Sequence, residues 1–269
     1  MMRILRKCLL MVLCLVPSAL SASGDDAGMW VSAGLEKELV KGLDAGFEAE
    51  YRLRDHFRAT DRWGAGLSVS YRLYRNASKT FSLKADAGVK YMKTYTPENI
   101  VLKGTDHGFQ EYNADESYAL DKIRTTVSVN GAFETGRFRI SLRERFQFTA
   151  NDSVLISETK WRYSKSFGEL VPAGEEEEWK GTDNRRYVLR SRLLVEYDIP
   201  KCKIDPYVSV ELYNDIADRF GLQKLRYQAG VEYKLHKKHG FKLYYAYQKK
   251  SDGDEPGGHI VGVNYCFSI

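Results

Sequence analysis

The sequence has few of the residues that build metal centres or disulfide frameworks. It contains four cysteines and five histidines in 269 residues, and they do not cluster with the spacing of a zinc site. It also lacks a glycine-rich phosphate loop. Beyond the N-terminus, no apolar run reaches the roughly 18 residues that a membrane helix needs. We therefore expect no cofactor and no metal ion, and a membrane crossing, if there is one, must use strands.

The N-terminus has the order of a secretory signal. Basic residues precede an apolar run at 8–16, and small residues follow at 19–23. This pattern predicts a signal peptide over residues 1–22, with cleavage near 21–23. Residues 23–269 then form the mature chain, which we expect to be a single domain.

Charge and cysteine content limit the function further. Three of the 41 basic residues lie in the leader, so the mature chain carries 38 basic and 36 acidic residues. This balance gives no support to nucleic-acid binding. Only Cys202 and Cys266 follow the leader, one in a predicted turn and one in a distant predicted strand. We expect two unpaired thiols, with a disulfide as the alternative in an oxidising compartment.

What the chain has in abundance is strict alternation of apolar with polar or small residues. In the range 44–54, apolar side chains occupy one face, and glycine or charged side chains occupy the other. Such segments predict an all-β fold, an antiparallel up-and-down transmembrane β-barrel of 10 to 12 strands. The predicted strands are residues 29–40, 44–54, 62–74, 79–93, 120–133, 137–149, 186–199, 204–213, 223–235, 240–249 and 258–269.

The connections alternate in length, as periplasmic turns and extracellular loops do in outer-membrane barrels. An even strand number is expected in such barrels, so either residues 29–40 lie outside the wall or a twelfth strand is hidden in a loop. The short connections are 41–43, 76–78, 134–136, 201–203 and 237–239, and the long polar loops are 55–61, 94–119, 150–185, 214–222 and 250–257.

A soluble lipocalin-like barrel shows the same alternation, so the identity of each face must decide. Charged residues in the middle of strands favour a polar lumen, and aromatic residues near strand ends favour two interfacial girdles. The chain ends in a strand like those recognised by the outer-membrane assembly machinery. We therefore expect contact with outer-membrane lipid, lipopolysaccharide and that machinery. Glu144 is the exception on the lipid face, for which a bulge or a protonated carboxyl is the expected explanation.

Several segments resemble an uncharacterised family of Gram-negative outer-membrane β-barrels. The resemblance implies the barrel fold and the outer-membrane location, and it supplies no catalytic residue. It is carried by residues 190–197, 206–215, 227–235 and 259–265, and by Trp30, the pair Arg54 and Asp55, and the run 142–146.

Inward-facing charges are the main candidates for function. In a barrel of this size they meet across the lumen, either as a narrow porin-like polar channel or as a salt-bridged plug that stiffens a closed barrel. The predicted lumen-lining residues are Glu48, Glu50, Arg52, Lys84, Asp86, Lys90, Arg143, Arg145, Arg190, Arg192, Glu196, Glu211, Arg226 and Glu232.

A lipid-modifying enzyme, a hydrolase or acyltransferase, is the alternative function. It requires a serine near a histidine at the outer rim, and the available histidines are His56, His107 and His259. The acidic run 175–178 lacks the spaced ligands of a calcium loop and is interpreted as a solvated loop. We favour a non-enzymatic barrel, either a narrow channel or an envelope-binding barrel for small polar solutes. The sequence leaves the ligand and the oligomeric state open.

Overall fold

The computed structural model describes residues 26–182, 185–236, 238–249 and 258–269. The predicted signal peptide and the loop 250–257 lie outside the described residues. Among the described residues, no helix has the length and apolar character to cross a bilayer.

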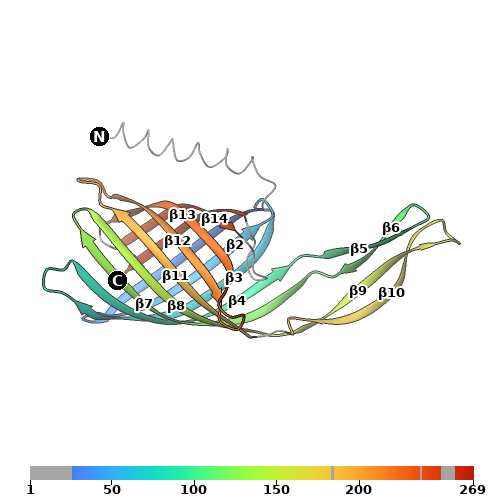
Figure 1. Ribbon diagram of the computed structural model, residues 1–269, viewed down its shortest axis with the longest axis horizontal. Helices are drawn as coiled ribbons and strands as arrows, with labels where there is room; N and C mark the ends of the chain where they lie inside the picture. The colour runs from blue at the N-terminus through green and yellow to red at the C-terminus, as the bar shows by residue number, and fades with distance from the viewer. Residues whose placement is uncertain (1–25, 183–184, 237, 250–257) are drawn as a thin grey trace.

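The described part of the chain is all-β, and eleven of its strands close into a barrel (Figure 1). Their spatial order is β1-β15-β14-β13-β12-β11-β8-β7-β4-β3-β2, so most neighbours in sequence are neighbours in the wall. The wall strands are β1 (Ala27–Val40), β2 (Leu43–Arg54), β3 (Ala59–Arg75), β4 (Phe81–Thr96), β7 (Tyr118–Thr135), β8 (Phe138–Asn151), β11 (Arg185–Tyr197), β12 (Ile204–Asp215), β13 (Gly221–Leu235), β14 (His239–Lys249) and β15 (Gly258–Ser268).

The barrel closes through a parallel pair. β1 and β15 run in the same direction, in register from Ala27 opposite His259 to Glu36 opposite Ser268. All other wall pairs are antiparallel. Because strand direction alternates around the wall and the number of wall strands is odd, the first and last strands point the same way. The eleven predicted strands are therefore confirmed as wall strands. The expectation of an even number is wrong, because β1 belongs to the wall and no twelfth strand joins it in the described part of the chain.

The two faces of the wall have opposite chemistry. Apolar side chains point outward and are solvent-accessible, such as Leu67 with 62% exposure and Val127 with 53%. Long charged side chains point inward and include the most buried ones, such as Arg62 with 0% exposure and Lys224 with 2%. This inversion of a soluble core is the pattern of a barrel that faces lipid.

Glu144 lies on the outer face of β8 without any local irregularity. The register of β8 against both neighbours, β7 and β11, runs through this position without a shift, so the expected bulge is wrong. The carboxylate Oε2 accepts a hydrogen bond of 2.6 Å from the Ser191 hydroxyl, which lies opposite on β11. A neighbouring hydroxyl therefore satisfies one oxygen of this outward carboxylate.

Aromatic side chains gather on the outer face near both ends of the strands. The rings of Trp63 and Tyr91 lie 5.5 Å apart near one end, and those of Phe138 and Tyr197 lie 5.0 Å apart near the other. Phe138 and Phe148 stand about ten residues apart on β8, which spans about 25 Å for a strand tilted by about 40°. Two aromatic girdles at this separation match the hydrocarbon thickness of an outer membrane.

The sequence predicted long loops at 94–119 and 150–185, but the described residues of these segments are not irregular. They form two hairpins that pair into a four-stranded sheet, of order β10-β9-β6-β5, which projects from one end of the barrel (Figure 1). Across the β6–β9 pair, the rings of Tyr112 and Trp161 stack 5.8 Å apart. The strands of this sheet are β5 (Asn99–Asp106), β6 (Phe109–Asp115), β9 (Val154–Ser164) and β10 (Glu169–Lys180).

Candidate functional site

The lumen is the candidate site, and its two ends differ. We call the end from which the hairpin sheet projects the loop end, and the end with the short connections the turn end. Charged inward side chains near the loop end are buried, whereas charged ones near the turn end remain partly exposed, although apolar inward side chains there, such as Tyr207, are buried too. The side chains of Lys84 and Lys234, on the turn side, are 40% and 53% exposed.

A layer of inward side chains, which we call the lumen plug, fills the loop end. Each of its members is at most 8% exposed, and together they come from seven wall strands around the barrel. The lumen plug consists of Trp30, Arg62, Lys122, Arg124, Thr149, Tyr213, Lys224, Arg226 and Gln248.

Aromatic rings of the lumen plug contact cations within it and the neighbouring Arg52. The guanidinium carbon of Arg52 lies 3.8 Å from the centroid of Trp30, and that of Arg226 lies 4.6 Å from the same ring. Because β13 is three strands away from β1 in the wall, the Arg226 contact crosses the lumen. Tyr213 has Lys224 Nζ at 4.1 Å from its centroid. Such cation–π contacts are strongest when water is excluded.

Glycines allow two tyrosines to lie flat against the inner wall. A Cβ on Gly262 would stand 1.9 Å from the Tyr244 ring, and a Cβ on Gly230 would stand 2.7 Å from Tyr244 Cβ and 2.9 Å from the Tyr207 hydroxyl. Both glycines occupy register positions directly opposite Tyr244. The rings pack against bare backbone, and with Trp30 they belong to the buried apolar cluster of the lumen.

A cavity of about 280 Å³ lies on the turn side of the lumen plug. Gly66 and Gly88 form part of its lining, so this stretch of the inner wall has no side chain to fill the space. Its charged lining consists of two carboxylates and six basic side chains: Glu48, Glu50, Arg52, Lys90, Arg124, Arg145, Arg190 and Arg226.

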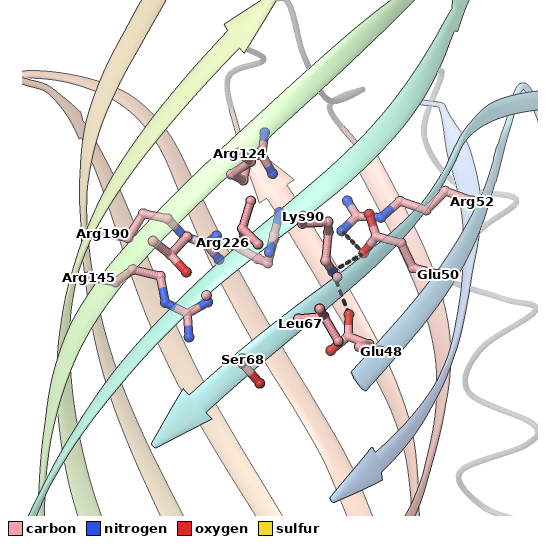
Figure 2. A pocket seen from close by; sticks show the side chains of 14 residues that line it. Glu48, Glu50, Arg52, Leu67, Ser68, Lys90, Arg124, Arg145, Arg190 and Arg226 are labelled. Carbon is pink, nitrogen blue, oxygen red and sulfur yellow. Dashed lines mark hydrogen bonds and ion pairs between the residues drawn. The ribbon is translucent and has the colours of Figure 1, made fainter. Parts of the chain in front are cut away.

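One wall of the cavity is an ion-pair network. Lys90 Nζ donates to Glu48 Oε1 at 2.6 Å and to Glu50 Oε2 at 3.2 Å, and Arg52 Nη2 donates to Glu50 Oε2 at 3.1 Å. Figure 2 shows these four side chains together on one side of the cavity. Two cations and two carboxylates balance here, so this wall is electrically neutral.

The opposite wall is strongly basic, and we call it the arginine wall. It consists of Arg145, Arg190 and Arg226 on the cavity lining, with Arg143 and Arg192 beside them on β8 and β11, and these arginines lie around the carboxylate of Glu211. Glu211 Oε1 accepts bonds of 2.8 Å from Arg143 and 3.0 Å from Arg190. Glu211 Oε2 accepts from the Tyr213 hydroxyl at 2.8 Å and from Arg226 at 3.4 Å. Figure 2 shows Arg145, Arg190 and Arg226 across the cavity from the ion-pair network.

The remaining predicted lumen residues lie nearer the turn end. Lys84 Nζ is 3.1 Å from Asp44, and Asp86 accepts a 3.3 Å bond from Ser128. Glu232 is 3.2 Å from Lys242 Nζ, in a second cavity of about 250 Å³ that also reaches Glu48. Glu196 lies 3.8 Å from Arg139, at a third cavity of about 240 Å³.

Several residues of the lumen plug were absent from the sequence-based set. Arg62, Lys224 and Gln248 share the inward parity of their strands, so alternation was the signal that could have found them. Trp30 and Tyr213 are also inward. They serve as partners for buried cations.

The three candidate histidines lie apart from one another. His56 occupies the β2–β3 turn, 3.8 Å from Asp55, and His107 occupies the tip of the β5–β6 hairpin, with Nδ1 2.8 Å from Asp106. His259 is the second residue of β15, and its Nδ1 is 2.5 Å from the Tyr245 hydroxyl. The described hydrogen bonds bring no serine hydroxyl to His56 or His107.

Among the residues that the structure describes, two groups of side chains could hold a cation. Asp26, Asp55 and His56 form one, and Asp115, Glu158 and Glu178 form the other, between the hairpins. In the second group, Lys180 already supplies positive charge, at 2.6 Å from Glu178 and 3.2 Å from Asp115. The hydrogen bond to Glu178, supported by that to Asp115, raises the pKa of Lys180. Cys202 and Cys266 are free thiols.

No curated protein matches the chain. Solved structures that the chain matches include the β domain of the Bordetella autotransporter Brka, with 13% identity, a TM-score of 0.41, and coverage of 85% of this chain and 82% of that chain. Another is the translocator domain of the autotransporter NalP from Neisseria meningitidis, with 11% identity, a TM-score of 0.44, and coverage of 94% and 93%. Neither likeness bears on function. The family model described as "Protein of unknown function (DUF2490)" matches residues 27–256, and the chain belongs to this family.

Proposed function

We propose that the mature chain, residues 23–269, is an integral outer-membrane barrel that binds a small polar solute in its lumen. The apolar outer face and the two aromatic girdles support insertion in a bilayer. Short connections face the periplasm in outer-membrane barrels, so the turn end opens toward the periplasm. In this proposal the protein is an envelope-binding barrel, and its solute enters the lumen from the periplasmic side.

The difference in burial between the two ends of the lumen carries this proposal. The lumen plug is almost inaccessible to solvent, while the cavity lies on its turn side and is lined mainly by charged and small side chains. A water-filled channel needs a continuous polar path, and the lumen plug interrupts it. A binding barrel closed toward the outside fits this arrangement better than a constitutive narrow channel.

Planar-bilayer conductance tests the closed end. The wild-type protein should show no steady single-channel current, because the lumen plug fills the loop end. Trp30→Ala removes the ring between Arg52 and Arg226 and should produce measurable current. Trp63→Ala is the control, because Trp63 points outward into the girdle. Steady wild-type current of the same size as that of Trp30→Ala would contradict the proposal.

Thiol accessibility tests the open end. In a background with Cys202→Ser and Cys266→Ser, Ser68→Cys places a thiol on the lining of the cavity. Thr149→Cys places a thiol in the lumen plug, where the native residue is 2% exposed. A bilayer-impermeant maleimide applied to the protein in vesicles should label Ser68→Cys and leave Thr149→Cys unmodified. Equal labelling at both positions would show that the lumen is open throughout.

A further inference from the structure

Every short connection at the turn end contains a basic residue, and we call this set the basic rim. It consists of Lys41, Lys79, Arg137, Lys201, Lys203 and Lys238. We infer that the basic rim binds the headgroups of anionic phospholipids, such as phosphatidylglycerol, in the periplasmic leaflet. This inference rests on the membrane insertion and orientation in the proposed function, but it does not depend on the lumen or its solute.

The two ends of the barrel differ in the charge of their connections. At the turn end, the described connections carry the six residues of the basic rim and one acidic residue, Asp198. At the loop end, the described connections between strands carry three basic and five acidic residues: Arg58, Lys165, Arg219, Asp55, Glu98, Glu116, Asp152 and Asp218. Among the described connections, the positive excess therefore lies at the turn end.

Ion pairs do not neutralise the basic rim. All six residues are exposed, and none of them forms an ion pair with another residue that the structure describes. Acidic side chains on the neighbouring strand ends have cations of their own, as Asp44 has in Lys84. Asp198 lines a cavity together with Arg137. Setting this arginine against that carboxylate still leaves the five lysines without an acidic partner in the connections.

The short turns place these charges at the depth of the lipid headgroups. On the outer face, the ring of Phe138 lies 5.0 Å from that of Tyr197, and Phe241 is another exposed ring near this end. Such rings favour the boundary between hydrocarbon and headgroups. Arg137 directly precedes Phe138, and Lys238 precedes Phe241 by three residues. With a rise of about 3.3 Å per residue, these charges lie within about 10 Å of the girdle, where long basic side chains reach phosphate oxygens.

The distribution of the basic rim favours a lipid surface over a soluble acidic partner. The five connections join β1 to β2, β3 to β4, β7 to β8, β11 to β12 and β13 to β14, so they follow one another around the whole barrel (Figure 1). Headgroups surround an inserted barrel in the same way, whereas a folded partner would contact one sector of it. Lysine and arginine near an anionic membrane surface each strengthen association by about fivefold.

Electron spin resonance of spin-labelled lipids tests the inference in phosphatidylcholine vesicles that contain the mature barrel. The motionally restricted fraction of a labelled lipid gives its association constant at the protein, relative to phosphatidylcholine. Wild-type protein should prefer phosphatidylglycerol by about three- to fivefold at low salt. Sodium chloride at about 1 M should remove most of this preference, because it shortens the Debye length to about 3 Å. Equal association of the two lipids at low salt would overturn the inference.

Two matched triple variants locate the preference on the protein. The rim variant removes three positive charges at the turn end: Lys79→Asn, Lys201→Asn and Lys238→Gln. The control variant removes three at the loop end: Arg58→Gln, Lys165→Gln and Arg219→Asn. Asparagine replaces the residues with positive φ, because it tolerates that conformation. The rim variant should lose at least about half of the preference, since half of the basic rim is gone, and the control should keep all of it. Equal losses would overturn the inference.

A second measurement uses unaltered protein, in case the variants do not fold. An amine-reactive ester acetylates accessible lysines, and mass spectrometry reads each position. Vesicles that contain phosphatidylglycerol should protect Lys79, Lys201 and Lys238, compared with vesicles of phosphatidylcholine alone. Lys93 is the control, an outward lysine near the loop end that lies 3.8 Å from Asp121, and its reactivity should not change. Equal protection at all four lysines would contradict a role of the basic rim.

Two further outcomes separate this inference from its alternatives. Protection of the same lysines by soluble polyglutamate, but not by phosphatidylglycerol, would assign the basic rim to a soluble acidic partner and overturn the inference. Absence of any restricted lipid component would contradict bilayer insertion, and the proposed function would fail with the inference. Restricted lipid without a preference for phosphatidylglycerol overturns the inference alone and leaves the conductance and thiol tests of the lumen unaffected.

Discussion

The two halves of the lumen are built from the same strands and the same alternation, yet they differ in accessibility. Near the loop end, Trp30 and Tyr213 lie between cations and exclude water. On the turn side, Gly66 and Gly88 leave a cavity, and lysine side chains extend into solvent. The comparison teaches that inward charge alone does not decide between a plug and a pocket. The size of the neighbouring inward side chains decides it.

The environment also changes how much an ion pair contributes to the free energy of unfolding. The pair of Arg139 and Glu196 has its closest atoms 3.8 Å apart, and the arginine side chain is 47% exposed. Solvent screens such a pair, and exposed pairs contribute about 0–1 kcal/mol. Glu211, in contrast, is 5% exposed and accepts bonds from three arginines and a tyrosine. Breaking a buried pair of this kind typically costs about 3–5 kcal/mol.

The largest expected effect therefore comes from neutralising the buried carboxylate. Glu211→Gln should lower the free energy of unfolding by about 3–5 kcal/mol, because it removes the buried negative charge to which Arg143, Arg190 and Arg226 donate. Urea unfolding of the barrel in detergent measures this.

The matched substitution in the open half is Glu196→Gln. It should lower the free energy of unfolding by no more than about 1 kcal/mol, because water already screens the partner arginine. Equal losses at the two positions would mean that the arginine wall is as well solvated as the turn end, and the contrast between the halves would fail.

A smaller effect is expected from filling the space beneath Tyr244. Gly262→Ala places a Cβ 1.9 Å from the ring, so the tyrosine must leave its position against the wall. We expect a loss of about 1–3 kcal/mol, the usual cost of overpacking. Gly240→Ala is the control in the open half, where the nearest atom to the added Cβ is 3.9 Å away. The same unfolding assay should find little change there, and equal costs would contradict the packing argument.

The wall could be predicted from the sequence because its signal is local. Alternation with a period of two fixes which side chains share a face, and it assigns Glu48 and Arg190 to the interior wherever the strand begins. The parallel closure of β1 on β15 could not be predicted, because it depends on the ends of the chain meeting. The assumed even strand number came from the class of bacterial barrels and not from these residues.

The hairpin sheet and the division of the lumen into a buried and an open half also could not be predicted from the sequence. Residues 175–178 are consecutive glutamates, which carry no alternation, so the strand that they form relies on pairing with β9. Likewise, parity places both Arg226 and Lys234 inward on β13. Only the three-dimensional structure shows that Arg226 contacts the ring of Trp30 and that Lys234 is exposed to solvent.

The outer face provides the smallest and most local test of the comparison. Ser191→Ala removes the hydroxyl that donates to Glu144, where no lumen water can replace it. We expect a loss of about 1 kcal/mol in vesicles, the usual cost of an unmade hydrogen bond to a buried group. Ser128→Ala removes the corresponding donor to Asp86 on the inner face, at the longer distance of 3.3 Å, and should cost less. A larger loss from Ser128→Ala would mean that the inner carboxylate is less hydrated than the lipid-facing one, contrary to an open turn side.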